Sequence, residues 1–173
     1  MLPLRLPLIL TALILASSSA TAQQLKSDLD KLDAKHGFRD VKLADTVTAI
    51  AGLQLIKDAG DVKEYKRSTD ELAIGSNQLQ AITYRFYRGR LAAVELLPRT
   101  FSDGHGIVGK FSEVFGTSLT TWEDEIKGEL REWKGQTTRL SYLYLKPGNY
   151  TTITFSDVKL SERLPASFKP ATR

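Results

Sequence analysis

The chain has 173 residues, with 24 Lys and Arg against 20 Asp and Glu, so that its formal net charge is +4. It contains no cysteine, which excludes disulfides, cysteine nucleophiles, thiolate metal sites and lipidation of an N-terminal cysteine. Charges of both signs are interspersed along the sequence, which is typical of an ordinary solvated surface and does not favour nucleic acid as a partner.

The first 22 residues have the pattern of a secretory signal peptide. Arg5 is the only charge before Lys26, an apolar run extends from Leu6 to Ala16, and small residues precede Gln23. The run is too short to span a membrane comfortably, so we favour cleavage over retention as an anchor. We therefore expect a periplasmic or secreted protein that does not span the membrane after cleavage. The predicted parts are a signal peptide (1–22), a single α+β domain (23–160) and a disordered C-terminal tail (161–173).

The segment after the signal peptide predicts several short elements. Leucines at helical spacing before Gly37 predict a short helix, and turn residues separate the alternating segments that follow it. The predicted elements are a helix over Ser27–His36, a strand over Phe38–Leu43, one or two helical turns over Asp45–Ala51, a hairpin of Leu53–Lys57 with Val62–Arg67, and a turn at Gly75–Gln78.

The clearest predicted element is a β-hairpin from Ala81 to Pro98. We expect a three-residue loop, Tyr87 to Gly89, in which the glycine takes the left-handed conformation. This loop pairs Phe86 with Arg90 and leaves one face of the hairpin apolar. The predicted apolar face consists of Ile82, Tyr84, Phe86, Ala92, Val94 and Leu96. The predicted mixed face consists of Thr83, Arg85, Tyr87, Leu91, Ala93 and Glu95.

The second half of the chain predicts one long helix and then a β-meander. The helix begins with Ser102 or Asp103 as its cap and ends at Gly116. Its apolar stripe is Ile107, Val108, Phe111, Val114 and Phe115. The predicted fold is thus α+β: an antiparallel sheet of hairpins and a meander, with this main helix packed on one face and short helices at the N-terminus. A weak internal repeat is also suggested, with helical and strand segments over Asp45–Leu97 and again over Ser102–Phe155.

The sequence offers little support for catalysis. Gly104, Gly106 and Gly109 match G-x-G-x-x-G, but the preceding strand belongs to a hairpin and not to a βαβ unit, so we favour close helix packing over nucleotide binding. The two histidines, His36 and His105, have no neighbours at metal-ligand spacing. An acidic cluster (Glu123, Asp124, Glu125 and Glu129) could do acid–base work but is more typical of a solvated face. We expect no cofactor and no metal.

We favour a binding role, because the sequence places aromatic residues beside arginines. Arg85 and Tyr87 are neighbours on the mixed face of the hairpin, and Arg131, Trp133 and Arg139 belong to the C-terminal meander. Such pairs are common at binding hot spots. The expected partner is an envelope protein or an anionic cell-wall polymer. We therefore predict an exported, non-catalytic binding or interaction protein, with an envelope-acting enzyme such as a hydrolase as the alternative.

The segments HGFRDVKL (36–43), ELAIG (71–75), AITYRFYRGRL (81–91) and EVFG (113–116) resemble small uncharacterised proteins exported by bacteria. Residues 41–97 are also similar, more faintly, to the outer-membrane-assembly lipoproteins of the SmpA/OmlA type. This chain departs from them by lacking the lipidation cysteine and by having Ala44 where a glycine is usual. The second resemblance implies an interaction module and assigns no functional residue.

Overall fold

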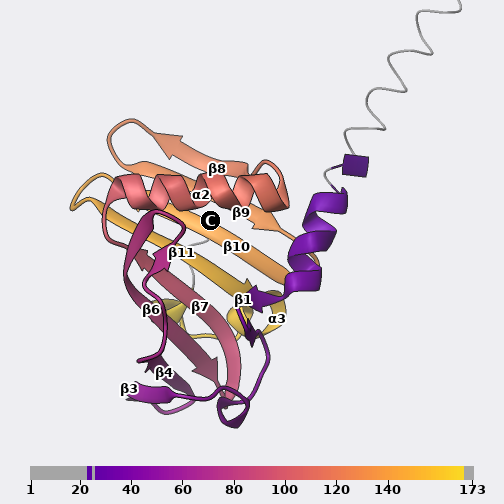
Figure 1. The fold of residues 1–173 in the computed structure, drawn as a ribbon, viewed down its shortest axis with the longest axis vertical. Coiled ribbons are helices and arrows are strands. Elements are labelled where there is room, and N and C mark those ends of the chain that lie inside the picture. Colours follow the sequence, from indigo (N-terminus) through magenta and orange to yellow (C-terminus); the bar gives the residue numbers. More distant parts are fainter. Residues whose placement is uncertain (1–22, 25, 170–173) are drawn as a thin grey trace, which may run out of the picture.

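The computed structural model of the chain describes residues 23–24 and 26–169, and the predicted signal peptide lies outside them (Figure 1). A helix over residues 26–35 comes first. The elements that follow are β1 (Gly37–Phe38), β2 (Val41–Lys42), η1 (Val47–Ala49), β3 (Leu53–Ala59), β4 (Val62–Arg67), β5 (Ala73–Ile74), β6 (Asn77–Tyr87), β7 (Arg90–Pro98), α2 (Phe101–Phe115), β8 (Leu119–Asp124), β9 (Gly128–Lys134), β10 (Thr138–Leu145), β11 (Tyr150–Asp157), α3 (Val158–Glu162) and η2 (Ala166–Phe168).

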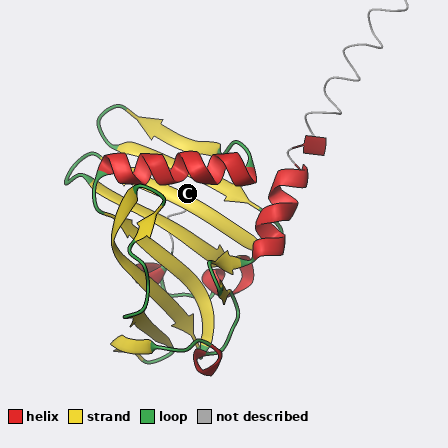
Figure 2. Cartoon of the chain, in the orientation of Figure 1, coloured by secondary structure: helices red, strands yellow, loops and turns green. Residues whose placement is uncertain are grey.

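Strands β3 to β11 form one antiparallel sheet, which confirms the predicted α+β class. The strand order is β3-β4-β6-β7-β11-β10-β9-β8, and β5 pairs with β6 beside it. Helix α2 crosses one face of the sheet and contacts β6, β7 and β11 (Figures 1 and 2). Within the part of the chain that the structure describes, every helix is too short or too polar to cross a membrane.

The sheet consists of two meanders with the same strand order and, across their first three strands, the same register. β3-β4-β6-β7 make the first meander, β8-β9-β10-β11 make the second, and β7 pairs with β11 between them. Each meander has an irregularity at the same place between its first two strands, at Ile56 and at Thr121. The pair Lys63–Phe86 of the first meander is equivalent to Glu129–Tyr144 of the second. Likewise, Tyr65–Tyr84 is equivalent to Arg131–Tyr142.

The pairing of β7 with β11 is itself symmetric. Glu95 lies opposite Thr154 at the centre, with Leu96 opposite Ile153 on one side and Val94 opposite Phe155 on the other. The weak repeat in the sequence is therefore a repeated topology, related by a pseudo-twofold axis at the centre of the sheet. The two halves differ in what precedes the meander. In the second half it is α2, and in the first half it is the helix over residues 26–35, the β1–β2 hairpin and η1.

The register predicted for the central hairpin was wrong: it is one residue off at the loop and two residues off further along, where Tyr84 pairs with Val94 and Ile82 with Leu96. Tyr87 pairs with Arg90, so Arg88 and Gly89 alone form the turn, with φ values of 48° and 77°. Positive φ at both positions is the type I′ geometry that matches the twist of hairpin strands. This turn pairs Phe86 with Leu91 and places Leu91 in the main core, and a bulge at Ala92 then leaves Ala92 on the other side of the sheet and Val94 opposite Tyr84 in the core.

Helix α2 buries most of its predicted stripe. Ile107, Val108 and Phe115 are buried, and Phe111 packs edge-on against the ring of Phe155. Val114, however, is 50% exposed and was wrongly included. The cap also differs from the prediction: the Thr100 hydroxyl accepts a hydrogen bond from the Asp103 N–H, and the helix starts at Phe101.

The predicted disordered tail is ordered as far as Lys169. Asp157 caps α3, η2 follows, and Leu164 is 2% exposed. Leu164 packs with Val62 and Ala92 in a second apolar cluster on the side of the sheet opposite α2. The prolines of this segment suggested disorder, but its apolar side chains pack against the sheet and order it. Residues 170–173 of the predicted tail lie outside the described residues.

The carboxylate of Asp33 fastens the N-terminal helix to the sheet. It accepts hydrogen bonds from the N–H groups of Gln136, Thr137 and Thr138, the three residues around the start of β10, at 2.6 to 2.9 Å. Burial alone would raise the pKa of Asp33, but these hydrogen bonds outweigh it and lower the pKa. The ionised carboxylate therefore stabilises the docked helix.

Candidate functional site

Arg85, the first predicted binding residue, is buried. Its Nε donates to Glu64 at 2.8 Å, Nη2 lies 3.4 Å from Glu95, and Nη1 donates to the carbonyl of Phe168 at 3.0 Å. The guanidinium thus neutralises two carboxylates under the C-terminal segment. The premise that the mixed face of the hairpin is open was wrong, because the segment expected to be disordered covers it.

The other predicted binding residues do not gather into one surface. Tyr87 is half-buried against the second apolar cluster. Trp133 is 1% exposed and donates its indole N–H to the Gly116 carbonyl at 2.6 Å, so it belongs to the core. Arg139 lies 3.7 Å from Glu132 on the side of the sheet opposite α2. Arg131 lines a surface pocket.

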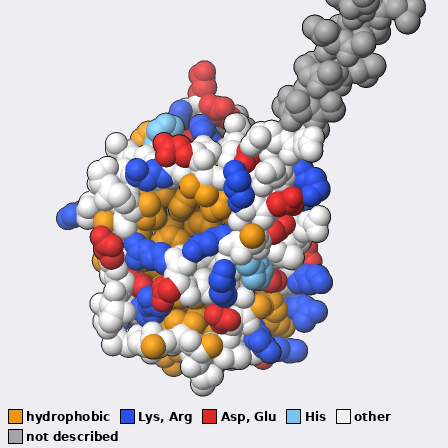
Figure 3. All heavy atoms as spheres, turned by 45° about the vertical axis from the view of Figure 1, so that its right-hand side comes forward, with side chains coloured by type: hydrophobic (Ala, Val, Ile, Leu, Met, Phe, Trp, Pro, Cys, Tyr) orange, Lys and Arg blue, Asp and Glu red, His pale blue; other side chains and the backbone are white. Residues whose placement is uncertain are grey.

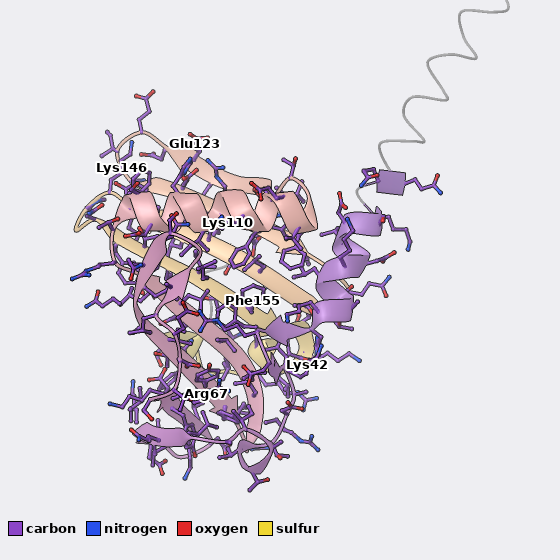
Figure 4. All side chains as sticks on the ribbon, in the orientation of Figure 1. Lys42, Arg67, Lys110, Glu123, Lys146 and Phe155 are labelled. Carbon is purple, nitrogen blue, oxygen red and sulfur yellow. The ribbon has the colours of Figure 1, made fainter. Side chains whose placement is uncertain are left out.

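That pocket, which we call the acidic cup, lies where the first turns of α2 meet the ends of β8, β9 and β10. Phe101 and Tyr144 form its aromatic floor, with ring centroids 4.3 Å apart, and His105 extends the floor at 5.9 Å from Phe101. Figure 4 labels Glu123 and Lys146 at this end of the molecule. The cup encloses about 240 Å³, enough for one side chain or a small ring.

Four carboxylates and two cations line the cup. The carboxylates are Glu123, Asp124, Glu125 and Glu129, and the cations are Arg131 and Lys146. Arg131 is paired with Glu129 at 2.7 Å, and Lys146 bonds the backbone carbonyl of Glu125. Among the described residues, no cation forms an ion pair with Glu123 or Glu125. The cup is therefore negative on a chain whose net charge is positive.

The turn that carries these acids is held in shape by one of them. Asp124 accepts hydrogen bonds from the N–H groups of Lys127 and Ile126, each at 2.8 Å. These bonds lower the pKa of Asp124, with the largest contribution from Lys127. Asp124 thus positions the rim, and Glu123 and Glu125 present charge to solvent.

Sequence analysis found the acidic cluster but not the cup. Phe101, His105 and Tyr144 are far from Glu123 in the chain, and only the pairing of β10 with β9 and the crossing of α2 bring them together. The position of His105 one helical turn after Phe101 was the available local signal.

The glycines of the G-x-G-x-x-G pattern serve packing. A Cβ on Gly104 would lie 2.5 Å from the Thr151 side chain, and one on Gly106 would lie 2.2 Å from Asn77, whereas a Cβ on Gly109 would meet nothing within 4 Å. The first two glycines therefore let α2 lie close to the strands, which agrees with the packing interpretation of the motif.

The other histidine lies in a chain of polar side chains. His36 Nδ1 is 2.8 Å from the Thr138 hydroxyl, and Nε2 is 3.5 Å from Asp157. This order resembles a hydrolytic triad, but Thr138 is fully buried. A substrate cannot reach that hydroxyl, so the group joins the N-terminal segment to the sheet and the start of α3. Over the described residues, no group of three or more His, Asp or Glu is placed to hold a metal ion.

The chain matches no protein-family model, no curated protein and no solved structure. The resemblances drawn from the sequence therefore stay predictions, and the candidate site rests on its geometry.

Proposed function

We propose that the protein is an exported, non-catalytic binding protein whose acidic cup receives a basic side chain of a partner protein. The observation that carries the proposal is the aromatic floor beneath an excess of carboxylates. An aromatic face attracts a guanidinium or ammonium group, and carboxylates complete its charge and hydrogen bonding.

The surroundings of the cup favour recognition over chemistry. Phe101 is 37% exposed and rests on Tyr144, which packs against the main core, so the floor is rigid. Rigid aromatic residues give contact area at low entropic cost. The negative rim disfavours an anionic polymer at this site and favours a cationic segment of an envelope protein.

Figure 3 shows a different view of the surface, in which Lys, Arg, Asp and Glu are intermingled around an apolar patch. The excess of one sign at the acidic cup is thus a local feature. A local charge of this kind steers a partner of opposite charge and suppresses like-charged partners.

A direct test uses a hexa-arginine peptide as the probe and isothermal titration calorimetry at low salt. The variant Glu123→Gln/Glu125→Gln should weaken binding about tenfold. Phe101→Ser should weaken it as well, because the ring that contacts both Tyr144 and His105 is removed from the aromatic floor.

The matched control is Glu71→Gln/Glu113→Gln, which makes the same change in net charge at exposed positions outside the cup. The control should bind as tightly as the unchanged protein. Equal weakening of both double variants would refute the cup and indicate attraction by overall charge alone.

Export is the second part of the proposal, and the signal-peptide pattern supports it. Mass spectrometry of the protein from its native compartment should find an N-terminus at Gln23. Intact Met1 in the soluble cytosol would contradict the proposed localisation.

A further inference from the structure

The first half of the chain has a hollow at the position equivalent to the acidic cup. We call it the η1 hollow, and it lies between η1, the β3–β4 turn and the β6–β7 turn, at the opposite end of the sheet. It encloses about 380 Å³. Its interior is formed by Val47, Tyr65 and Phe86, with the last two rings edge to face at 5.1 Å.

The equivalence follows from the register. Lys63 opposite Phe86 in the first meander corresponds to Glu129 opposite Tyr144 in the second. Both hollows thus have an aromatic residue near the end of the third meander strand and a charged residue opposite it. The sign of that charge is reversed, because a lysine replaces a glutamate.

The cations of the η1 hollow are held by exchangeable ion pairs. Arg88 lies 2.9 Å from Asp61, and Lys63 lies 2.8 Å from Asp58. In both pairs each side chain is more than two-fifths exposed. Such surface pairs contribute little to stability, so a carboxylate on a ligand can replace Asp61 or Asp58 at little cost.

The backbone of Arg88 is a second, independent observation. Arg88 takes φ of 48° at the first central position of a type I′ turn, where asparagine, aspartate or glycine is preferred. The hairpin therefore keeps a long cation at a position that disfavours it. Strain of this kind is characteristic of positions where a side chain is required for another purpose.

We infer that the η1 hollow binds a carboxylate carried on an apolar or aromatic body. Tyr65 and Phe86 contact the body, and Arg88 and Lys63 hold the carboxylate. This site is separate from the acidic cup, so the protein presents hollows of opposite preference at the two ends of one sheet.

The test is a titration of ¹⁵N-labelled protein with phenylacetate, followed by the amide signals of Gly60 and Gly89. Saturable shifts at these two glycines are expected. The neutral isostere phenylacetamide should bind about tenfold more weakly, because it lacks the charge-assisted hydrogen bond to a guanidinium. Equal affinity for the two compounds, or no shift at either glycine, would overturn the inference.

The variant Arg88→Asn separates binding from folding. It should bind phenylacetate about tenfold more weakly while melting at a higher temperature, since Asn-Gly is the preferred type I′ pair. Asp61→Asn, which removes the competing carboxylate, should bind more tightly. Undiminished binding by Arg88→Asn would remove Arg88 from the proposed site and overturn the inference. A lower melting temperature would show that the Arg88 side chain is kept for stability instead.

Discussion

The buried ion pairs of Arg85 give the sharpest prediction about stability. Its side chain is 9% exposed, and those of Glu64 and Glu95 are 13% and 26% exposed. The substitution Arg85→Met keeps much of the side-chain volume and removes the charge. Two largely buried carboxylates then lose their partner, and the Phe168 carbonyl loses a donor.

The expected magnitude follows from these losses. Removal of one partner from a buried ion pair costs about 3–5 kcal/mol, chiefly because the remaining charge stays buried. For a chain of this size, each kcal/mol lowers the melting temperature by about 2–4 °C. Arg85→Met should therefore lower the unfolding free energy by about 3–5 kcal/mol.

Urea unfolding followed by the fluorescence of the buried Trp133 measures this loss. The triple variant Arg85→Met/Glu64→Gln/Glu95→Gln should recover most of it, because no unpaired charge remains. Arg99→Met, at an exposed arginine, should change stability by less than about 0.5 kcal/mol. A loss below about 1 kcal/mol for Arg85→Met would show that water solvates the guanidinium and that the C-terminal segment does not cover it.

Two further predictions concern the attachment of helices to the sheet. Asp33→Asn should destabilise the protein by about 1–3 kcal/mol at pH 7. Because the pKa of Asp33 is lowered in the folded state, its contribution is complete above its unfolded pKa of about 4 and is lost as pH falls through the folded pKa. Urea titrations should therefore show that the difference in unfolding free energy between Asp33→Asn and the unchanged protein is smaller at strongly acidic pH than at neutral pH. A difference that does not change with pH would refute the role of the Asp33 charge. Gly104→Ala should lower stability by about 1–2 kcal/mol through the clash with Thr151, whereas Gly109→Ala should raise it by up to about 1 kcal/mol through helix propensity; thermal unfolding distinguishes the two, and a gain in both would contradict the packing described for α2.

Local patterns were sufficient to predict most elements of the fold. Alternation identified the central hairpin, and helical spacing identified α2. The register of that hairpin failed because its loop has two residues and not three, and because Leu91 and Ala92 are both apolar, so that the pattern was compatible with either residue facing the core. The two-residue turn at Arg88 selects Leu91, and the bulge at Ala92 depends on the neighbouring strands, which no local pattern encodes.

The candidate site was less accessible to sequence analysis than the fold. Glu123 and its neighbours were visible as a charge cluster, but the aromatic floor of Phe101 and Tyr144 is assembled from separate elements. Arg85 was selected for its chemistry and proved to be a structural residue, because the segment that ends in Phe168 binds back onto the sheet. Contacts between distant segments decide both outcomes, and a single sequence contains no direct signal of them.

The pairing of β7 with β11 has a consequence for how the chain reaches this structure. Every other strand pair of the sheet joins strands that follow one another in the chain or, for β4 and β6, are separated only by the short β5, whereas this pair joins the two meanders. Local hairpins form faster than distant pairings, so closing this joint is the slow step expected in folding. Across the joint, Val94 faces Phe155, the equivalent of Leu96, and Leu96 faces Ile153, the equivalent of Val94. Until the joint closes, each half exposes a strand edge that can pair with the complementary edge of another chain, which favours exchange of halves between molecules at high protein concentration.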